Sequence, residues 1–371
     1  MNQQKYPDRI RVGILGAGGI AETHAEVLAS IDGVDRVGIC DMQFSKAENF
    51  QRKMGLPMAY SQLETMLAEA KPDVVHLAVS PAVHAATAIA CLDRGISVFV
   101  EKPFCLTVGE CAQVTASAAR SGAQIGVNHN MVFFPGVNRA IDAIKEGRLG
   151  QIEHATLAFH VPMPELPYGP YSHWLFQKSG NIVFELGVHP LSVVHRLFGK
   201  VLEMQTLCSG EKVLPSGVTF YSMWQIAMRC ERGTATLLLS VAAGFHDIWL
   251  HIQGEDGVCH ADLRRNTTVF SGKSQDLRPN DDLRDSWQAA RSLAKDGLRH
   301  YRNYLKASLR RKAPYPTQYA SMDSSIRAFY SALRAGSQPP VGAPEGAAVV
   351  EACQLAVRQF TREVEMAGVA Q

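Results

Sequence analysis

The chain has 371 residues, of which 46% are hydrophobic and 19% are charged. This balance excludes a wholly disordered protein, and the length suits about two domains of ~150 residues each. Basic residues outnumber acidic ones by only two, which excludes a nucleic-acid-binding protein that acts through a strongly basic overall charge.

The N-terminal residues contain no apolar core of a secretory signal, and no segment approaches the roughly 20 apolar residues of a membrane span. The eight cysteines are scattered and form no C-x-x-C pair. Reduced, buried thiols are therefore expected rather than disulfides or a metal site. We expect a soluble cytoplasmic protein without a transmembrane segment.

In the first third of the chain, short apolar runs alternate with segments of helical composition. The expected strands are 9–16, 34–40, 74–79, 96–100 and 123–128, and the expected helices are 21–30, 45–54, 61–70, 82–94 and 107–121. This alternation predicts an α/β domain over residues 1–128, with a doubly wound parallel sheet of the Rossmann type. The almost uniform apolarity of the strands fits a sheet that is covered on both faces.

The alternation of strands and helices ends after residue 128. A helix (136–146), a long strand (151–161), a proline-rich loop (161–171) and a helix (181–198) are followed by strands at 201–208, 219–230, 234–242, 247–254, 258–263 and 267–271, then by helices at 284–312, 318–335 and 345–366. Residues 231–233 and 255–257 have hairpin-turn composition. We therefore expect an α+β domain over residues 129–371 with a large, mainly antiparallel open sheet.

Residues 16–21 read Gly-Ala-Gly-Gly-Ile-Ala, directly after the first expected strand and at the start of a helix. That context is typical of a dinucleotide-binding turn. Gly16 makes the tight turn, Gly18 lets the backbone approach a pyrophosphate, and Ala21 keeps the helix close to the sheet. The predicted cofactor-binding residues of this turn are Gly16, Gly18, Gly19, Ile20 and Ala21.

Asp41 ends the second strand, 20 residues beyond Ala21. A carboxylate at this place binds the 2′-hydroxyl of an adenosine ribose and repels a 2′-phosphate. The sequence therefore favours NAD over NADP as the cofactor. A glycine turn that binds no nucleotide remains the simpler alternative.

Two further places carry polar groups suited to chemistry. Lys102 follows a strand and precedes Pro103, so it projects near the carboxyl end of the expected parallel sheet, where ligands bind. Glu185 and His189 stand four residues apart and are predicted to share one helix face, with Gly187 between them leaving room for a ligand. Histidine exchanges protons near neutral pH, and a carboxylate can orient it.

Together these features resemble the Gfo/Idh/MocA family over nearly the whole chain. The resemblance rests on the glycine turn, Ser80-Pro81 with His84, Glu101-Lys102-Pro103, Trp174 and segment 180–189. It implies that the nicotinamide lies over the helix of the second domain, with Lys102 and His189 beside the reacting carbon. It also implies that Ser80, Pro81, His84, Glu101 and Asn128 lie on the cofactor side, and that the large sheet forms a homodimer or homotetramer.

One residue departs from the family pattern. The family usually has aspartate four residues before its histidine, and this chain has Glu185, whose carboxylate reaches one methylene further.

The function that follows is an NAD(P)-dependent dehydrogenase or reductase acting on a secondary alcohol or ketone. In this hypothesis Lys102 polarises the reacting oxygen, His189 exchanges the proton and Glu185 orients the histidine. Two alternatives stay open: glycoside cleavage with bound NAD as a transient oxidant, and a non-catalytic NAD-binding sensor. A metal site at Glu185 and His189 is disfavoured, because the histidines are dispersed.

The resemblance implies a sugar, cyclitol or sugar nucleotide as the substrate. Aromatic faces suit the C–H faces of a sugar ring, and histidines can bond its hydroxyls. Besides Lys102, Glu185 and His189, the candidate substrate residues are His129, Phe133, Tyr168, His173 and Trp174. Phe133 and Trp174 are equally suited to the core.

Segment 284–312 has nine Lys or Arg and two Asp, a net charge of +7. Its apolar residues recur every three or four positions and form one helical stripe. They are Trp287, Ala290, Ala294, Leu298, Tyr301, Leu305 and Leu309. The pattern favours a helix that packs this stripe on the sheet and leaves its basic face in solvent. The alternatives are an anchor for an anionic substrate and contact with an anionic membrane surface.

Overall fold

A computed structural model describes residues 9–242, 244–273, 278–309 and 316–369, which form two compact units. The first unit consists of Met1–Asn130 and Met322–Glu351, and the second of Met131–Ser321 and Ala352–Gln371. The first boundary lies two residues from the predicted one at 128. The difference from the predicted division is Met322–Glu351, which the sequence pattern placed in the second domain and the structure joins to the first.

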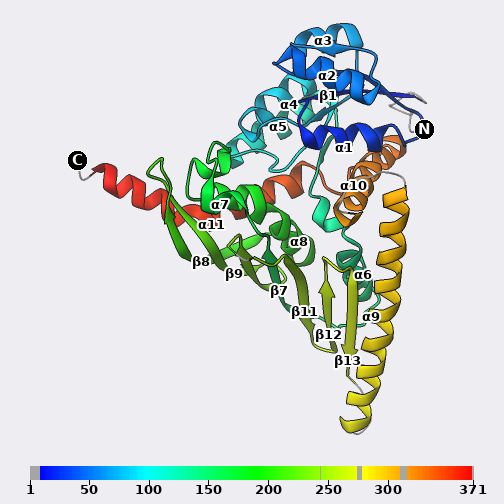
Figure 1. The fold of residues 1–371 in the computed structure, drawn as a ribbon, viewed down its shortest axis with the longest axis vertical. Coiled ribbons are helices and arrows are strands. Elements are labelled where there is room, and N and C mark those ends of the chain that lie inside the picture. The colour runs from blue at the N-terminus through cyan, green and yellow to red at the C-terminus, as the bar shows by residue number, and fades with distance from the viewer. Residues whose placement is uncertain (1–8, 243, 274–277, 310–315, 370–371) are drawn as a thin grey trace. The chain divides into compact units, whose positions relative to one another are not determined.

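The N-terminal part of the first unit, drawn in blue and cyan in Figure 1, contains a parallel sheet. Its strand order is β3-β2-β1-β4-β5-β6. The strands are β1 (Ile10–Leu15), β2 (Val34–Cys40), β3 (Ala59–Tyr60), β4 (Val74–Leu77), β5 (Ser97–Val100) and β6 (Ile125–Val127). Every residue of β4, β5 and β6 is buried, which explains why these strands are apolar apart from His76 and Ser97. The predicted doubly wound parallel fold is confirmed, and β3, only two residues long, was not predicted.

Helices connect these strands: α1 (Gly19–Leu28), α2 (Phe44–Met54), α3 (Leu63–Ala70), η1 (Pro81–Val83), α4 (His84–Leu92) and α5 (Val108–Ser121). The bounds of α5 follow from its sequence. Thr107 and Glu110 form a capping box at its start, and Gly122 ends it with a φ of 68°.

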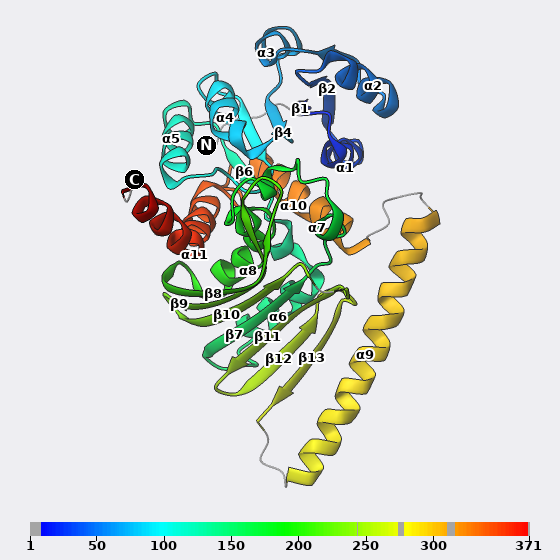
Figure 2. The ribbon, with the colours of Figure 1, turned by 60° about the vertical axis from the view of Figure 1, so that its left-hand side comes forward.

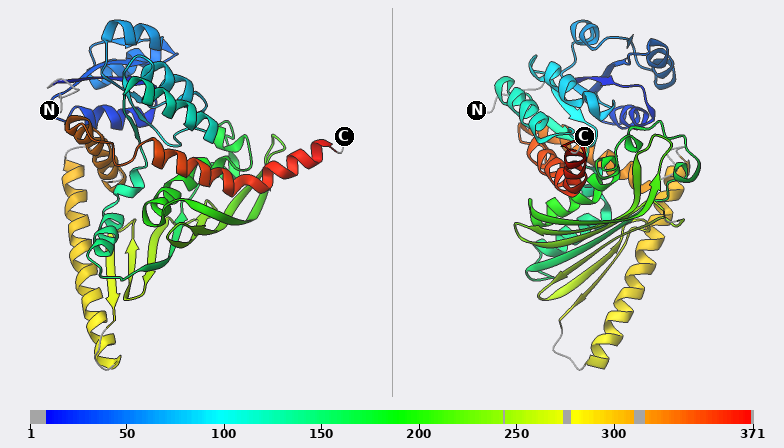
Figure 3. Two further views of the ribbon diagram at one scale, coloured as in Figure 1. Left: turned by 180° about the vertical axis from the view of Figure 1, so that it is seen from behind. Right: turned by 90° about the vertical axis from the view of Figure 1, so that its left-hand side faces the viewer.

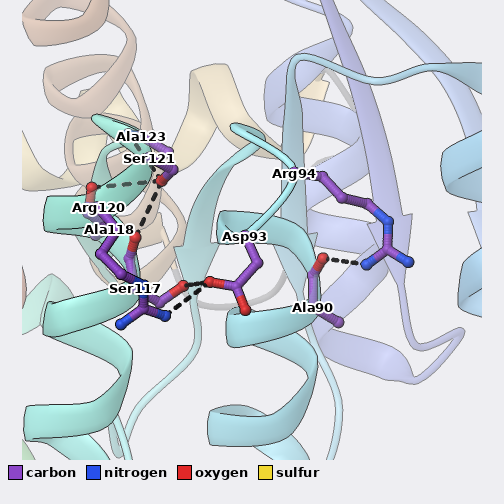
Figure 4. Close-up of polar contacts among 8 residues, drawn as sticks. All are labelled: Ala90, Asp93, Arg94, Ser117, Ala118, Arg120, Ser121 and Ala123. Carbon is purple, nitrogen blue, oxygen red and sulfur yellow. Dashed lines mark hydrogen bonds and ion pairs between the residues drawn. The ribbon is translucent and has the colours of Figure 1, made fainter.

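Polar contacts join α4 to α5 just beyond the end of α4 (Figure 4). The Asp93 carboxylate accepts hydrogen bonds from the Ser117 hydroxyl at 2.5 Å and from the Arg120 guanidinium at 2.9 Å. These two bonds lower the pKa of Asp93, and the bond from Ser117 has the larger effect. The two helices are thereby held together on the surface of the sheet.

The segment Met322–Glu351 belongs to the first unit because its side chains complete the core there. It includes most of α10 (Pro316–Ala335) and the start of α11 (Ala343–Val369). Phe329 packs 5.2 Å from Phe99 between ring centroids, and a Cβ added to Gly126 would lie 2.5 Å from the Phe329 ring. The Val127 amide also donates to the Val341 carbonyl at 3.0 Å.

The second unit is built on a seven-stranded sheet in the order β13-β12-β11-β7-β10-β9-β8 (Figure 2). Its strands are β7 (Ile152–His160), β8 (Val201–Val213), β9 (Thr219–Cys230), β10 (Gly233–Ser240), β11 (Asp247–Gly254), β12 (Gly257–Asp262) and β13 (Thr267–Gly272). β7 and β10 pair in parallel, and the other pairs are antiparallel. The predicted mainly antiparallel sheet is therefore confirmed, including both predicted hairpins.

The remaining elements are η2 (Asn130–Phe133), α6 (Pro135–Lys145), α7 (Glu165–Tyr168), η3 (Trp174–Phe176), η4 (Val183–Gly187), α8 (Val188–Phe198) and α9 (Arg278–Leu309). α6 packs on β12 and β13, and α8 on β7 and β10. Leu157, Leu237 and Leu250 are fully buried and stand opposite one another on neighbouring strands. The sheet therefore has one core face, and α8 is held on it.

α9 runs along the edge of the sheet beside β13 (Figure 3). The expectation that its apolar stripe packs on the sheet was wrong. Trp287 is 71% exposed, Leu298 66% and Tyr301 58%. The contact with the sheet is instead polar: buried Asp296 accepts from the Thr268 amide of β13 at 3.2 Å. The stretch 310–312 of the predicted helix, with its three basic residues, and the side chains of Lys306 and Leu309 lie outside the described residues.

All eight cysteines are free thiols, and seven of them are buried. Burial raises the pKa of several, for example that of Cys40 to about 11 and that of Cys91 to about 12. Thiols with such pKa values are unreactive near neutral pH. In the described part of the chain, no three histidine, cysteine or carboxylate side chains gather closely enough to hold a metal ion.

Candidate functional site

The glycine turn follows β1. It is packed against the protein at Gly16 and open at Gly18 and Gly19. Gly16 has a φ of +98°, and a Cβ there would lie 2.2 Å from the Ala78 carbonyl oxygen. Only glycine fits at this position. A Cβ at Gly18 or Gly19, by contrast, would meet nothing within 4 Å, so the backbone there is accessible to a ligand.

The N-terminus of α1 begins directly after this turn. Gly18 is its N-cap residue and supplies no side-chain cap, while Ala21 is fully buried and lets the helix lie close to the sheet. The amide groups of the first turn and the helix dipole both favour an anion at this end. The predicted fit of a pyrophosphate is consistent with this geometry.

Asp41 is tied to the glycine turn. One carboxylate oxygen accepts from the Ala17 amide at 2.9 Å, and the other accepts from the Gln43 amide at 2.9 Å. Each carboxylate oxygen has a second lone pair, so both can still accept a hydrogen bond from a ribose hydroxyl. The two elements that the sequence linked by spacing are thus joined by a hydrogen bond.

A second loop pair lies at the ends of β4 and β5. The ring nitrogens of buried His84 lie 2.8 Å from the Pro103 carbonyl oxygen and 3.1 Å from the Val79 carbonyl oxygen. Burial lowers the pKa of His84. His84 therefore holds the loop after β4 to the loop that carries Lys102, and the structure gives it a positioning role; contact with a cofactor stays a prediction.

Within these loops, Ser80 is exposed, and Pro81 and Lys102 are half-buried. The peptide bond between Lys102 and Pro103 is cis.

Glu101 is buried beside Lys102 and is bonded from two sides. His24 Nε2 lies 2.7 Å from its Oε1, and the Asn128 side-chain amide donates to the same oxygen at 2.6 Å. Burial alone would raise the pKa of Glu101. The bonds from His24 and Asn128, with the charges of His24 and Lys102, outweigh burial and lower this pKa to about 2.

The contacts continue inward from His24. Its Nδ1 lies 2.7 Å from Nδ1 of His76, whose Nε2 lies 2.9 Å from the Tyr330 hydroxyl. We refer to Asn128, Glu101, His24, His76 and Tyr330 as the histidine chain; all five are buried.

The ionised Glu101 only accepts, so His24 Nε2 donates to it. The direction of the other two contacts, from His24 to His76 and from His76 to Tyr330, is set by the tautomers of the two rings.

Sequence reasoning missed His24, His76 and Tyr330. The signal was a histidine at a buried position: His24 falls on the apolar face of α1 with Ala21, Ala25 and Leu28, and His76 stands inside the apolar strand β4.

One atom of the histidine chain has no partner among the described residues. Asn128 Oδ1 is buried and accepts no hydrogen bond there. A ligand with an amide N–H, such as the carboxamide of a nicotinamide, would satisfy it. Together with the open glycine turn, this acceptor fits the expected cofactor.

The second unit holds Trp174, Asn181, Glu185 and His189, which we call the tryptophan cluster. The Trp174 indole N–H donates to Glu185 Oε2 at 2.9 Å, and the Asn181 side-chain amide donates to the Trp174 carbonyl at 2.7 Å. Asn181 and Glu185, on the helix that begins near residue 181, therefore hold both the backbone and the side chain of Trp174. Glu185 and His189 are half-buried, so both remain accessible.

The predicted helix over 181–198 contains a π-helical segment, η4, before α8. Such segments are rare in proteins, and where they occur they often lie at functional sites. Glu185 lies within it and His189 at the start of α8, so the helix that carries both residues is not a regular α-helix throughout. The His189 ring stacks on Phe159 with centroids 6.0 Å apart.

The sequence suggested that Gly187 leaves room for a ligand, but the structure shows that it does not. It is buried, and an added Cβ would lie 3.1 Å from Val183 Cγ1. Its small size accommodates the Val183 side chain of the same segment.

The other candidate substrate residues differ in exposure. His129 is buried, Phe133 is half-buried and His173 is exposed. Tyr168, on α7, is 92% exposed. The loop that carries it is fixed by Lys212 of β8, which donates to the Pro167 carbonyl at 3.0 Å and the Tyr171 hydroxyl at 2.9 Å.

Comparison with known proteins gives two family matches. A model described as "Oxidoreductase family, NAD-binding Rossmann fold" matches residues 10–129, and a "GFO/IDH/MocA C-terminal domain" model matches residues 137–260. Together the two models match more than half of the chain.

Similar curated proteins include D-apiose dehydrogenase of Paraburkholderia graminis, at 24% identity over 54% of this chain and 53% of that protein. Myo-inositol 2-dehydrogenase of Thermotoga maritima is 22% identical over 70% of this chain and 77% of that protein. For D-apiose dehydrogenase and for other curated relatives, the chain spans about half of the relative's length.

Among solved structures, the WlbA dehydrogenase of Bordetella pertussis, in complex with NADH and UDP-GlcNAcA, shares the fold. The TM-score is 0.74 at 17% identity, over 94% of this chain and 95% of that one.

Proposed function

The chain belongs to the Gfo/Idh/MocA oxidoreductase family, and from this premise we propose that it moves a hydride between a nicotinamide cofactor and a secondary alcohol or ketone of a sugar, cyclitol or sugar nucleotide. The observation that carries the proposal is the glycine turn, open at Gly18 and Gly19 and bonded through Ala17 to Asp41. Relatives named as D-apiose and myo-inositol dehydrogenases support the substrate class.

The cofactor would be held by two groups of residues in the first unit. One binds the adenosine and pyrophosphate part: Gly16, Gly18, Gly19, Ile20, Ala21 and Asp41. The other borders the nicotinamide: Ser80, Pro81, His84, Glu101, Lys102 and Asn128. Asp41 would repel a 2′-phosphate, which favours NAD over NADP. When bound, the nicotinamide supplies the acceptor or donor of the hydride.

The chain's own residues would manage the oxygen and its proton. Lys102 Nζ would donate a hydrogen bond to the reacting oxygen and stabilise negative charge that develops there. An imidazole nitrogen of His189 would take the hydroxyl proton during oxidation and return it during reduction. Glu185, fixed by Trp174, would orient His189 or stabilise its charged form.

A spectrophotometric screen tests the proposal. The full-length protein is mixed with NAD⁺ or NADP⁺ and with free sugars, inositols, uronates and nucleotide sugars, and NADH or NADPH formation is followed. We expect net reduced cofactor with one class and a preference for NAD⁺. Glycoside cleavage without net NADH would favour the hydrolase alternative, and tight NAD binding without turnover would favour a sensor.

Lys102→Ala is the informative variant in the active system. Loss of the group that polarises the oxygen should lower kcat by about 10² to 10³ while NAD still binds. Lys71→Ala, at an exposed lysine of the same unit, is the matched control. Wild-type turnover in Lys102→Ala would contradict the assigned role.

A further inference from the structure

The apolar stripe of α9 lies in solvent along much of the helix. It consists of Leu283, Trp287, Ala290, Ala294, Leu298, Tyr301 and Leu305, and each of these residues is exposed. Large apolar side chains at this spacing rarely stay in water unless they meet a partner.

The stripe is not the face through which α9 contacts the sheet, because α9 contacts the sheet through its opposite side. There Asp296 accepts from the Thr268 amide at 3.2 Å and lies 3.8 Å from the Arg139 guanidinium. Arg139 in turn donates to the Thr268 hydroxyl at 2.9 Å. The stripe is therefore free to bind something outside the second unit's own sheet.

The charges beside the stripe show which partner fits. Arg291, Lys295 and Arg302 are exposed and lie within about a quarter turn of Trp287 around the helix axis. Between Ser286 and Leu305 the only carboxylate is Asp296, which is 8% exposed and points to the sheet. Between Ser286 and Leu305 the exposed surface of this helix is thus apolar and cationic, and it complements an anionic surface.

The first turns of the stripe have a mainly apolar surface. Leu283, Trp287 and Ala290 lie there beside Arg291, whereas Arg284 is paired with Asp281 at 3.0 Å and with Asp285 at 3.7 Å. An apolar surface with an exposed arginine beside it suits the boundary between acyl chains and charged headgroups.

We propose that α9 docks flat on the surface of an anionic lipid bilayer. Leucine and tryptophan side chains enter the boundary of the acyl chains, tyrosines lie at headgroup level, and the arginines and lysine meet lipid phosphates. In this arrangement α9 lies along the membrane surface. No described helix combines the length and the apolar composition needed to cross a bilayer. A second copy of the chain fits less well, because it would bring the same cations face to face.

Vesicle co-sedimentation of the full-length protein tests this proposal, which does not depend on the proposed function. We expect binding to phosphatidylcholine vesicles that contain phosphatidylglycerol, little binding to phosphatidylcholine alone, and weaker binding as salt rises. Each cation near the surface contributes about fivefold in affinity. The triple variant Arg291→Gln/Lys295→Gln/Arg302→Gln should therefore bind about 100-fold more weakly.

Two further variants complete the experiment. Trp287→Ser/Leu298→Ser removes exposed apolar groups and should abolish vesicle binding without altering the circular dichroism or the melting temperature. Arg52→Gln/Lys145→Gln/Lys200→Gln removes three exposed cations elsewhere and should bind like the wild type.

Three results would overturn the proposal. These are equal binding to neutral and anionic vesicles, no binding to either, and a dimer in light scattering that Trp287→Ser/Leu298→Ser dissociates while vesicles are ignored. The last result would assign the stripe to a second copy of the chain.

Discussion

The histidine chain and the tryptophan cluster both join a carboxylate to a ring N–H, in opposite surroundings. Glu101 is 7% exposed and bonded to fully buried His24, and the contacts continue inward to Tyr330. Glu185 is bonded to Trp174 but, like His189, stays half-buried. The first arrangement fixes a charge inside the protein, whereas the second leaves its acid and base accessible. Changes in the first should therefore affect stability, and changes in the second should affect turnover.

The largest effect is expected for His189→Ala. Removal of the proton-exchanging group should lower kcat by about 10² to 10⁴. Because the ring is only half-buried, the melting temperature should fall less than on loss of a fully buried histidine. Steady-state kinetics and calorimetry check both statements, with the exposed His260→Ala as the control. Normal kcat, or unfolding of the variant, would remove the contrast between the two regions.

His24→Ala should have the opposite profile. It leaves the buried Glu101 carboxylate without its imidazole donor, and a buried acceptor that loses a hydrogen bond in this way costs about 1–3 kcal/mol of the free energy of unfolding, and more when it is charged. Urea denaturation measures this loss. Glu101→Gln in the His24→Ala background should recover part of it, because an amide is cheaper to bury than a charge. A loss below about 1 kcal/mol would show that His24 does not stabilise Glu101.

Acid should destabilise the protein in two steps. Burial, with the charge of His24, lowers the pKa of His76 well below its usual 6.5, and burial also lowers that of His84. The unfolded chain then binds more protons, so the free energy of unfolding falls as the pH drops below about 6.5. Glu101, with a pKa of about 2 against 4.5 when unfolded, adds a second fall between those values. His76→Gln should shrink the first step and leave the second; two unchanged steps would exclude His76 as a source.

The smallest effect is expected for Trp174→Phe, which removes the indole N–H bonded to Glu185. One hydrogen bond to a charged group contributes about 1.5 kcal/mol, so kcat/KM should fall by about tenfold. The pKa that governs the pH profile of kcat should move if Glu185 acts on His189. An unchanged profile would reduce Trp174 to a substrate or packing role.

Much of the fold could be predicted from the sequence. β2, β9 and β11 begin and end at the predicted residues, because apolar runs and hairpin turns mark their ends. Periodicity shows that a helix has an apolar stripe, but it does not show what covers the stripe. In α10, Met322, Ile326 and Phe329 are buried in the first unit, whereas the equally regular stripe of α9 is exposed. The sequence pattern placed both helices in the second domain.

The candidate site divides along similar lines. The bond between Asp41 and the glycine turn follows from local spacing in a βαβ unit, so it could be predicted. The histidine chain could not, because His24 lies 52 residues from His76 and His76 lies 254 residues from Tyr330. The π-helical segment at Glu185 was missed for another reason: an i, i+4 pattern is the same in sequence whether or not the helix widens locally.

The most direct test of the central claim follows the hydride itself. A substrate found in the screen is prepared with deuterium on the reacting carbon and mixed with NAD⁺ and the full-length protein, and the cofactor is analysed by mass spectrometry. We predict that deuterium appears in the NADH at the rate of turnover, and that Lys102→Ala suppresses this transfer. Product that forms while the cofactor stays free of deuterium would contradict hydride transfer as the function of this protein.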